Sequence, residues 1–210
     1  MIENVLRRGR YGLLAAALVA SGCMSRLGGG ADAPVATFLL DTPQPAAVAA
    51  PAGAPVVLIA TPQVRAGYDS PRIAYSRRDF ELRYYARNEW ADAPATMLRP
   101  LVVRALAATG GLTPIVTTVN TEAPLWQLGI ELLELRQVYG AAGSEGRIVL
   151  RAELARADRP GRVRTAEFSA ARAATTPDPY GGVGALNGAL GEILPRLAAF
   201  VAAGVTTGGD

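Results

Sequence analysis

The chain has 210 residues, of which 50% are hydrophobic, and its formal net charge is +3 at pH 7. It contains no His and one Cys, and all 21 of its basic residues are arginines. This composition excludes Ser-His-Asp and Cys-His nucleophile systems, Schiff-base lysines and zinc sites with His or Cys ligands. It leaves open chemistry at carboxylates or tyrosines, or at a cation bound by oxygen atoms.

The first 22 residues have the pattern of a secretory signal peptide. Arg7, Arg8 and Arg10 give a basic start, an apolar run follows over 11–20, and small residues end the segment. That run is shorter than the roughly 20 residues that a lasting transmembrane helix needs. The segment has three arginines and one glutamate, a net +2, so the chain from residue 23 carries about +1. We therefore expect no nucleic acid partner.

The stretch Ala20-Ser21-Gly22-Cys23 resembles the bacterial lipobox. The resemblance implies that the Cys23 thiol receives a diacylglycerol, that residues 1–22 are removed, and that the new amine is acylated, with palmitate expected. The alternative is a signal peptide cut at another small residue, with Cys23 a bystander. We favour lipidation because a lone exposed thiol is a liability in an oxidising compartment. Asp after the cysteine retains enteric lipoproteins in the inner membrane, so by analogy Met24 favours the periplasmic face of the outer membrane.

The chain after Cys23 divides by composition. Residues 23–54 are rich in Ala, Pro and Gly, which predicts a tether with little core of its own. Within it, Thr37–Leu40 is a short apolar island and a candidate edge strand. Residues 55–203 are periodic and predict one domain of ordinary size. Residues 204–210 are expected to form a flexible tail.

The first half of the predicted domain contains strands and one helix. A short β-rich run predicts a strand over 55–60, and alternation after Arg78 predicts that Phe80, Leu82 and Tyr84 share one face of the next strand. Apolar residues near a 3.6-residue spacing predict an amphipathic helix over 89–109, with Trp90 on its buried stripe. Pro100 predicts a kink or break in that helix. A short strand is expected over 113–120.

The second half is a run of strands followed by a helix. Alternating residues over 125–135, 146–157 and 162–170, joined by short Gly-containing links, predict an antiparallel meander. A second apolar stripe predicts a helix over 182–202. The chain is therefore predicted to be α+β, with an antiparallel or mixed sheet of about five to six strands and two amphipathic helices packed on one face.

Three local patterns have functional and structural interpretations. Asp79 and Glu81 could form a carboxylate pair for acid–base chemistry, but they lie among arginines, which favours ion pairing on a solvated face. The mixture of Arg and aromatic residues over 77–87 is also found in binders of single-stranded nucleic acid, although the low charge argues against that role. Glycines over 181–188 follow a loop, so they do not form a dinucleotide fingerprint.

The order of these segments resembles the ABC-type transport auxiliary lipoproteins, which accompany MCE-domain lipid transporters and include the lipoprotein of the paraquat-inducible system. The resemblance covers about 55–200. Its motifs are a Tyr before an apolar and Arg-containing strand, a Trp-Ala pair, and two later strands: Tyr68, Ile73, Arg77, Trp90, Ala91, Glu134, Leu135, Gly146, Ile148, Leu150, Ala152 and Leu154.

The resemblance implies a non-catalytic, periplasm-facing accessory of an ABC transporter that moves phospholipid or other hydrophobic molecules. Its partners would be the MCE-domain protein and the permease and ATPase complex, and it could form homo-oligomers. It would need no cofactor beyond the lipid on Cys23. Tyr68, Arg77, Trp90 and Ala91 would be structural or partner contacts. Two alternatives stay open: an assembly factor or chaperone for an outer-membrane complex, and a carboxylate hydrolase of envelope polymers.

Overall fold

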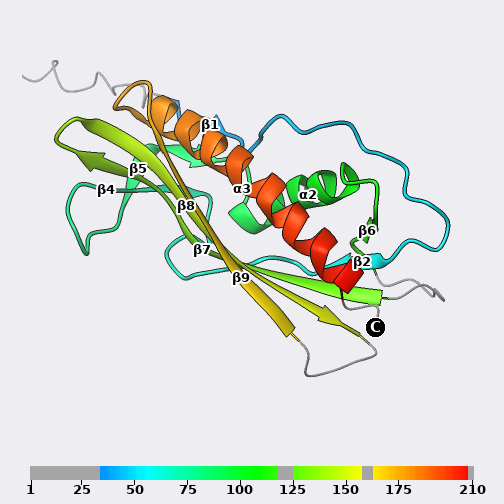
Figure 1. The fold of residues 1–210 in the computed structure, drawn as a ribbon. Helices are drawn as coiled ribbons and strands as arrows, with labels where there is room; N and C mark the ends of the chain where they lie inside the picture. Colours follow the sequence, from blue (N-terminus) through cyan, green and yellow to red (C-terminus); the bar gives the residue numbers. More distant parts are fainter. Residues whose placement is uncertain (1–33, 118–124, 158–162, 208–210) are drawn as a thin grey trace, which may run out of the picture. The chain divides into compact units, whose positions relative to one another are not determined.

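A computed structural model describes residues 34–117, 125–157 and 163–207. The chain divides into two units, Met1–Pro34 and Val35–Asp210, and the described elements all belong to the second. In chain order they are β1 (Ala36–Phe38), β2 (Val56–Ile59), β3 (Gln63–Val64), β4 (Arg72–Ser76), β5 (Arg83–Trp90), α2 (Pro94–Ala107), β6 (Thr113–Ile115), β7 (Leu125–Gly140), β8 (Gly143–Arg156), β9 (Val163–Ala173) and α3 (Pro179–Thr207) (Figure 1).

The described strands form one mixed sheet organised around β7. On one side β7 pairs antiparallel with β8, and β8 pairs antiparallel with β9, which confirms the predicted meander. On its other side β7 pairs in turn with three short parallel strands, β2, β3 and β4. β6 adds to β2, β5 adds to β4, and β1 adds to β5, giving nine strands where about five to six were predicted. The α+β class is confirmed, with both helices on one face of the sheet (Figure 1).

A β-bulge explains why the apolar alternation of β7 stops halfway. The pairing of β7 with β8 shifts between Leu132 and Glu134, which leaves Leu133 as the extra residue. Before the bulge the even-numbered residues are buried, and after it the odd-numbered residues Leu133, Leu135 and Gln137 are buried. The bulge therefore keeps both halves of the strand facing the helices.

The alternating run after Arg78 is not a single strand, so that prediction is wrong. β4 and β5 form an antiparallel hairpin, and residues 77–82 are the turn between them. Phe80 is fully exposed and has a positive φ of 61°, so it does not share a buried face with Leu82 and Tyr84. Alternation of residue types cannot reveal a tight turn that contains neither Gly nor Pro.

The predicted helix over 89–109 begins too early. Trp90 is the last residue of β5, and α2 starts at Pro94, where the fixed φ and missing N–H of proline suit the first helical position. Trp90 is held in the sheet by backbone pairing on both sides. It lies opposite Phe38 of β1, and its N–H donates to the Pro71 carbonyl, just before β4, at 2.6 Å. α2 continues through Pro100 without the predicted break.

Residues 35–54 pack against the domain, whereas the sequence predicted a tether up to residue 54. β1 pairs in parallel with β5 as an edge strand, as expected for the apolar island. Leu40 after it is buried, and Asp41 forms an ion pair with Arg104 of α2 at 2.8 Å. The Val48 N–H donates to the Ala107 carbonyl at 3.0 Å. Composition alone did not indicate this packing because the segment has no apolar period.

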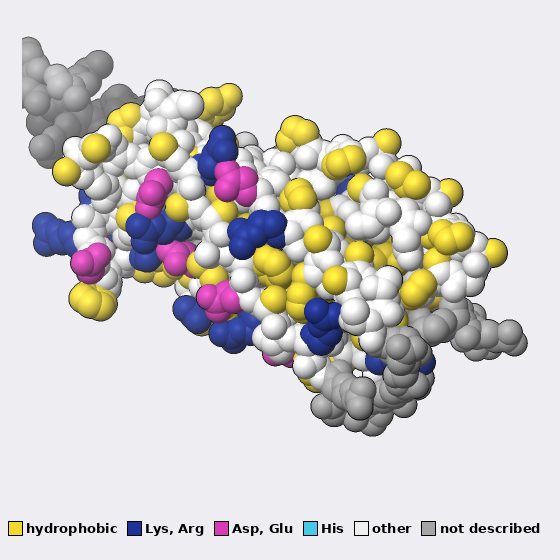
Figure 2. Space-filling view, viewed as in Figure 1, with side chains coloured by type: hydrophobic (Ala, Val, Ile, Leu, Met, Phe, Trp, Pro, Cys, Tyr) yellow, Lys and Arg dark blue, Asp and Glu magenta, His cyan; other side chains and the backbone are white. Residues whose placement is uncertain are grey.

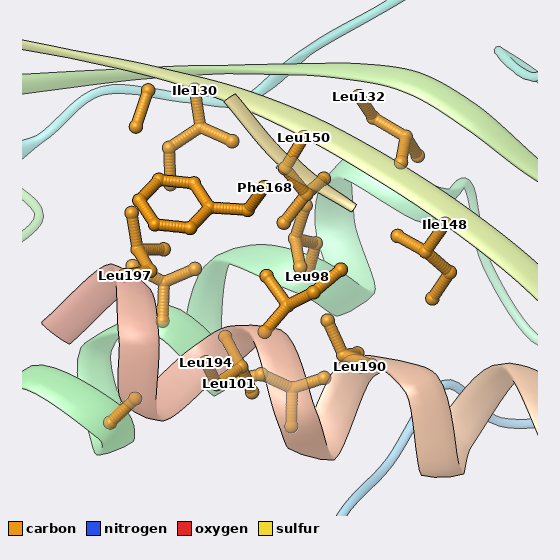
Figure 3. Packing of buried hydrophobic residues seen from close by; sticks show 14 of the residues in the cluster. Leu98, Leu101, Ile130, Leu132, Ile148, Leu150, Phe168, Leu190, Leu194 and Leu197 are labelled. Atoms are coloured by element: carbon orange, nitrogen blue, oxygen red, sulfur yellow. The ribbon is translucent and has the colours of Figure 1, made fainter. Parts of the chain in front are cut away.

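The core lies between the sheet and the two helices. Figure 3 shows side chains of α2 and α3 facing those of β7, β8 and β9: Leu98, Leu101, Ile130, Leu132, Ile148, Leu150, Phe168, Leu190, Leu194 and Leu197. α3 approaches β8 so closely that a Cβ on Gly146 would lie 2.5 Å from the Leu186 nitrogen, so no larger residue fits there. By contrast, Gly184 and Gly188 near the start of α3 have more open surroundings.

The C-terminal helix is longer than predicted. α3 extends to Thr207 with Gly204 and Val205 buried, so the expected tail from 204 begins inside the helix. By length and composition α3 could span a membrane. Its packing against β7, β8, β9 and α2 instead identifies it as a core helix.

Candidate functional site

Two of the predicted motif residues, Trp90 and Ala91, hold the edge of the sheet together. Trp90 is 2% exposed and belongs to the main hydrophobic cluster. The Ala91 N–H donates to the Phe38 carbonyl at 2.7 Å, which extends the ladder between β1 and β5 by one bond. The arrangement gives both residues a structural role in attaching β1. Cys23 lies outside the described residues.

Tyr68 lies in the loop between β3 and β4, where it is buried. Burial raises the pKa of its hydroxyl above the ordinary value, and nearby Arg136 acts in the opposite direction. The same loop is tied to β5, since the Tyr84 hydroxyl donates to the Gly67 carbonyl at 2.8 Å. The Arg72 guanidinium lies over the Tyr84 ring at 3.9 Å from its centroid. Tyr68 is therefore part of the buried packing of this loop.

Arg77 belongs to an aromatic cluster that the sequence analysis did not find. Tyr75 of β4 stacks on Tyr85 of β5, with ring centroids 4.5 Å apart, and meets Tyr139 of β7 edge-on at 5.9 Å. The Arg77 guanidinium lies 5.1 Å from the Tyr139 ring centroid, within range of a cation–π contact. The parallel pairing of β4 with β7 brings these rings together. Local residue spacing in the sequence does not predict this pairing.

A buried polar network continues from this cluster to the start of α3. Gln137 is 1% exposed; its Oε1 accepts from the Tyr85 hydroxyl at 2.7 Å, and its Nε2 donates to the Ser144 hydroxyl at 2.7 Å and the Asp178 carbonyl at 3.2 Å. Burial and the hydrogen bond with Tyr139 raise the pKa of Tyr85. This hydroxyl therefore stays protonated near neutral pH, and the network fixes α3 on the sheet.

Glu81, one of the two carboxylates considered for acid–base chemistry, is held by an arginine and a backbone N–H. Glu81 binds Arg83, with Oε1 2.8 Å from Nε, and accepts the Arg77 backbone N–H at 3.3 Å. The expected ion pairing is confirmed for Glu81. Within residues 34–117, 125–157 and 163–207 no group of three or more His, Cys, Asp or Glu side chains could hold a metal ion.

A groove lies between residues 41–47 and α2. Its volume is about 700 Å³, and its walls come from Ala and Pro side chains of the segment and from Val103 and Ala107 of the helix. The ion pair of Asp41 with Arg104 lies at its rim. Figure 2 shows that the right-hand part of this face, over α2 and the segment beside it, carries few charged side chains. The groove can accept an apolar chain.

The model of the ABC-type transport auxiliary lipoprotein component family matches residues 38–198. The chain belongs to this family. In this auxiliary lipoprotein the match begins within β1, which agrees with the packing of residues 35–54 on the domain. The family assignment confirms the resemblance inferred from the order of the motifs, and it implies association with a transporter and a place in the cell envelope.

Solved structures share the fold of this auxiliary lipoprotein. A crystal structure of a protein from Xanthomonas campestris has 22% sequence identity, covers 83% of this chain and 99% of its own, and has a TM-score of 0.66. A crystal structure of an uncharacterized protein has 13% identity, covers 82% and 99% of the two chains, and has a TM-score of 0.64. The comparison with curated proteins gave no match.

Proposed function

We propose that this auxiliary lipoprotein is a non-catalytic accessory of an ABC/MCE-type transporter that moves phospholipid or other hydrophobic substrates across the cell envelope. The match to the transport auxiliary family over residues 38–198 carries the proposal. The lipobox at Cys23 supports a lipid anchor, and Met24 favours the periplasmic face of the outer membrane. An accessory of this kind acts by binding its transporter and needs no reactive side chain.

The contacts of the reactive candidates support a non-catalytic role. Glu81 is held by Arg83 and by a backbone N–H, which leaves it poorly placed to exchange protons with a substrate. The raised pKa of Tyr85 makes its hydroxyl a weak acid, which does not readily give up its proton. These groups instead stabilise the β4–β5 turn and the junction of the sheet with α3.

We assign the contact with the transporter to the groove beside α2. A volume of about 700 Å³ lies within the roughly 300–1,000 Å³ typical of ligand sites, and its apolar walls suit an apolar segment of the partner. The ion pair of Asp41 with Arg104 offers charged groups at the rim that can set the orientation of that segment. Aliphatic walls with a polar rim are the usual anatomy of a protein interface.

The anchor is tested by labelling with a radioactive fatty acid. The parent protein should incorporate label and fractionate with outer membranes, whereas Cys23→Ser should lose the label and remain unprocessed or soluble. Label retained in Cys23→Ser would contradict anchoring through this thiol.

The partner is tested by capturing the full-length protein from envelope membranes and probing for the MCE-domain protein and the permease. The parent should retain both, and Val103→Arg, which places a charge in the groove, should lose them. Val163→Arg, at an exposed position on β9, is the matched control and should behave as the parent. Equal capture by both variants would overturn the assignment of the groove, and capture of neither component by the parent would overturn the transporter role.

A further inference from the structure

Three segments that are distant in sequence meet at one end of the sheet. β1 is not one of them, because it pairs with the last residues of β5, with Ala36 opposite Asn88 and Phe38 opposite Trp90. β4 and β7 run parallel toward the end where the three segments meet, with Ser76 opposite Val138. The β4–β5 turn, the β7–β8 turn and the start of α3 lie together at the left of Figure 1. We call this the Phe80 end, defined by residues 77–82, residues 140–143 and Tyr180.

The Phe80 end presents apolar side chains to solvent. Phe80 is fully exposed and Tyr180 is 77% exposed. Phe80 has a φ of 61°, which an aromatic residue rarely adopts. Glu81 keeps the turn in this shape through its bonds to the Arg77 N–H and the Arg83 side chain. The turn therefore holds Phe80 away from the core in a fixed conformation.

The turn around Phe80 has charged side chains of both signs, with more arginines than carboxylates. The arginines are Arg77, Arg78 and Arg83, the carboxylates are Asp79 and Glu81, and Glu81 is bound to Arg83. The turn has a net charge of +1 over these five residues. An aromatic ring beside exposed guanidinium groups fits the boundary of a bilayer, where rings lie at the headgroup level and arginines bind phosphates.

The chain length between the lipid site and the sheet selects the occupant. Eleven residues lie between Cys23 and Val35, and fully extended chain covers at most about 3.3–3.6 Å per residue, which limits the span to about 40 Å. A membrane that holds Cys23 therefore stays within about 40 Å of the start of β1. Tethering of this kind raises the effective concentration of the bilayer, so a weak second contact is well populated.

We propose that the Phe80 end rests on the bilayer that holds the lipid anchor, with Phe80 inserted at the headgroup boundary. This inference rests on the proposed anchoring through Cys23. The opposite end of the sheet, where Val163 begins β9, then faces away from that membrane. The contact orients the domain as well as placing it near the surface.

The test uses the full-length lipidated protein in vesicles of phosphatidylethanolamine and phosphatidylglycerol, with or without brominated acyl chains. Phe80→Trp places a fluorescent reporter at the tip, and Val163→Trp is the matched control at an exposed site on the other end. Emission is measured relative to the parent, since Trp90 and Trp126 are buried in all three proteins. Flotation of the vesicles first reports whether the protein is anchored, and the melting temperature reports whether each variant is folded.

Bromines should quench Phe80→Trp about two-fold, because interfacial side chains lie about 5–10 Å into the headgroup and acyl boundary, and should leave Val163→Trp unchanged. Equal quenching of both variants, or of neither, in protein that floats would overturn the membrane contact and leave the anchor standing. Shielding of Phe80→Trp only after addition of the transporter would overturn it in favour of a protein contact. Failure to float would overturn both the anchor and this inference.

Discussion

Replacing Trp90 by alanine should remove a large part of the free energy of unfolding of the domain. The side chain is 2% exposed at the end of β5, and an aromatic of this type buries about 150–250 Å², worth about 4–6 kcal/mol at roughly 25 cal/mol per Å². Measured truncations of buried aromatics cost about 3–5 kcal/mol, which is our expected loss. Unfolding free energies of whole domains are only about 5–15 kcal/mol.

The measurement is urea unfolding of the parent, Trp90→Ala and the exposed control Tyr180→Ala. For a domain of this size each kcal/mol shifts the melting temperature by about 2–4 °C, so Trp90→Ala should melt roughly 6–20 °C lower. Tyr180→Ala should stay within about 0.5 kcal/mol of the parent. Capture of the transporter by the same variant separates fold from partner contact. A Trp90→Ala protein that keeps its unfolding free energy but loses its partner would refute the core assignment.

Three further outcomes follow from the contacts of Tyr85, Phe80 and Asp178. Tyr85→Phe removes the donor to Gln137 and should lower the unfolding free energy by about 1–3 kcal/mol, since a buried acceptor is left unpaired; an unchanged value in urea unfolding would contradict the network. Phe80→Gly should raise it by about 0.4–1 kcal/mol, because glycine tolerates the positive φ, and a loss would show that the ring packs on the protein. The Gly181 N–H and the Thr176 hydroxyl lower the pKa of Asp178. Its ionised form therefore stabilises the fold above the ordinary pKa of about 3.9, and this contribution is lost as pH falls through the lowered value. The melting temperature of Asp178→Asn should thus lie below that of the parent at neutral pH and approach it in acid, and a constant difference would count against the charge.

Elements with a strong local period were predictable from sequence. The strands β7 and β8 alternate over Leu128, Ile130, Ile148 and Leu150, and short Gly-containing links made an antiparallel meander the simplest arrangement. The two helices were found from their apolar stripes, and their packing on one face followed from the need to bury both stripes.

Elements fixed by tertiary pairing were not predictable. The segment over 39–54 has no period, and its place on α2 depends on single contacts such as the ion pair of Asp41 with Arg104. Trp90 fits a helical stripe by spacing, but pairing with β1 keeps it in the sheet. The Tyr75 cluster likewise forms because β4 lies beside the far end of β7. Of the candidate site, sequence could name the motif residues and predict that Trp90 is buried, but it could not place Tyr68 in a buried loop or Arg77 beside the tyrosine rings.

A pull on the N-terminal segment acts first on β1. This strand has three residues, and a pull along the strand axis loads its hydrogen bonds with β5 in shear, so that they fail together. The next contacts to resist the pull are those of the buried Leu40 and the bonds of Asp41 to Arg104 and Asn187. Detaching β1 alone would lengthen the tether between Cys23 and the domain by about 10 Å, at about 3.3 Å per residue. The N-terminal segment is thus attached to the domain in two stages. The β1–β5 hydrogen bonds break first, and the contacts of Leu40 and Asp41 then carry the load before it reaches the core.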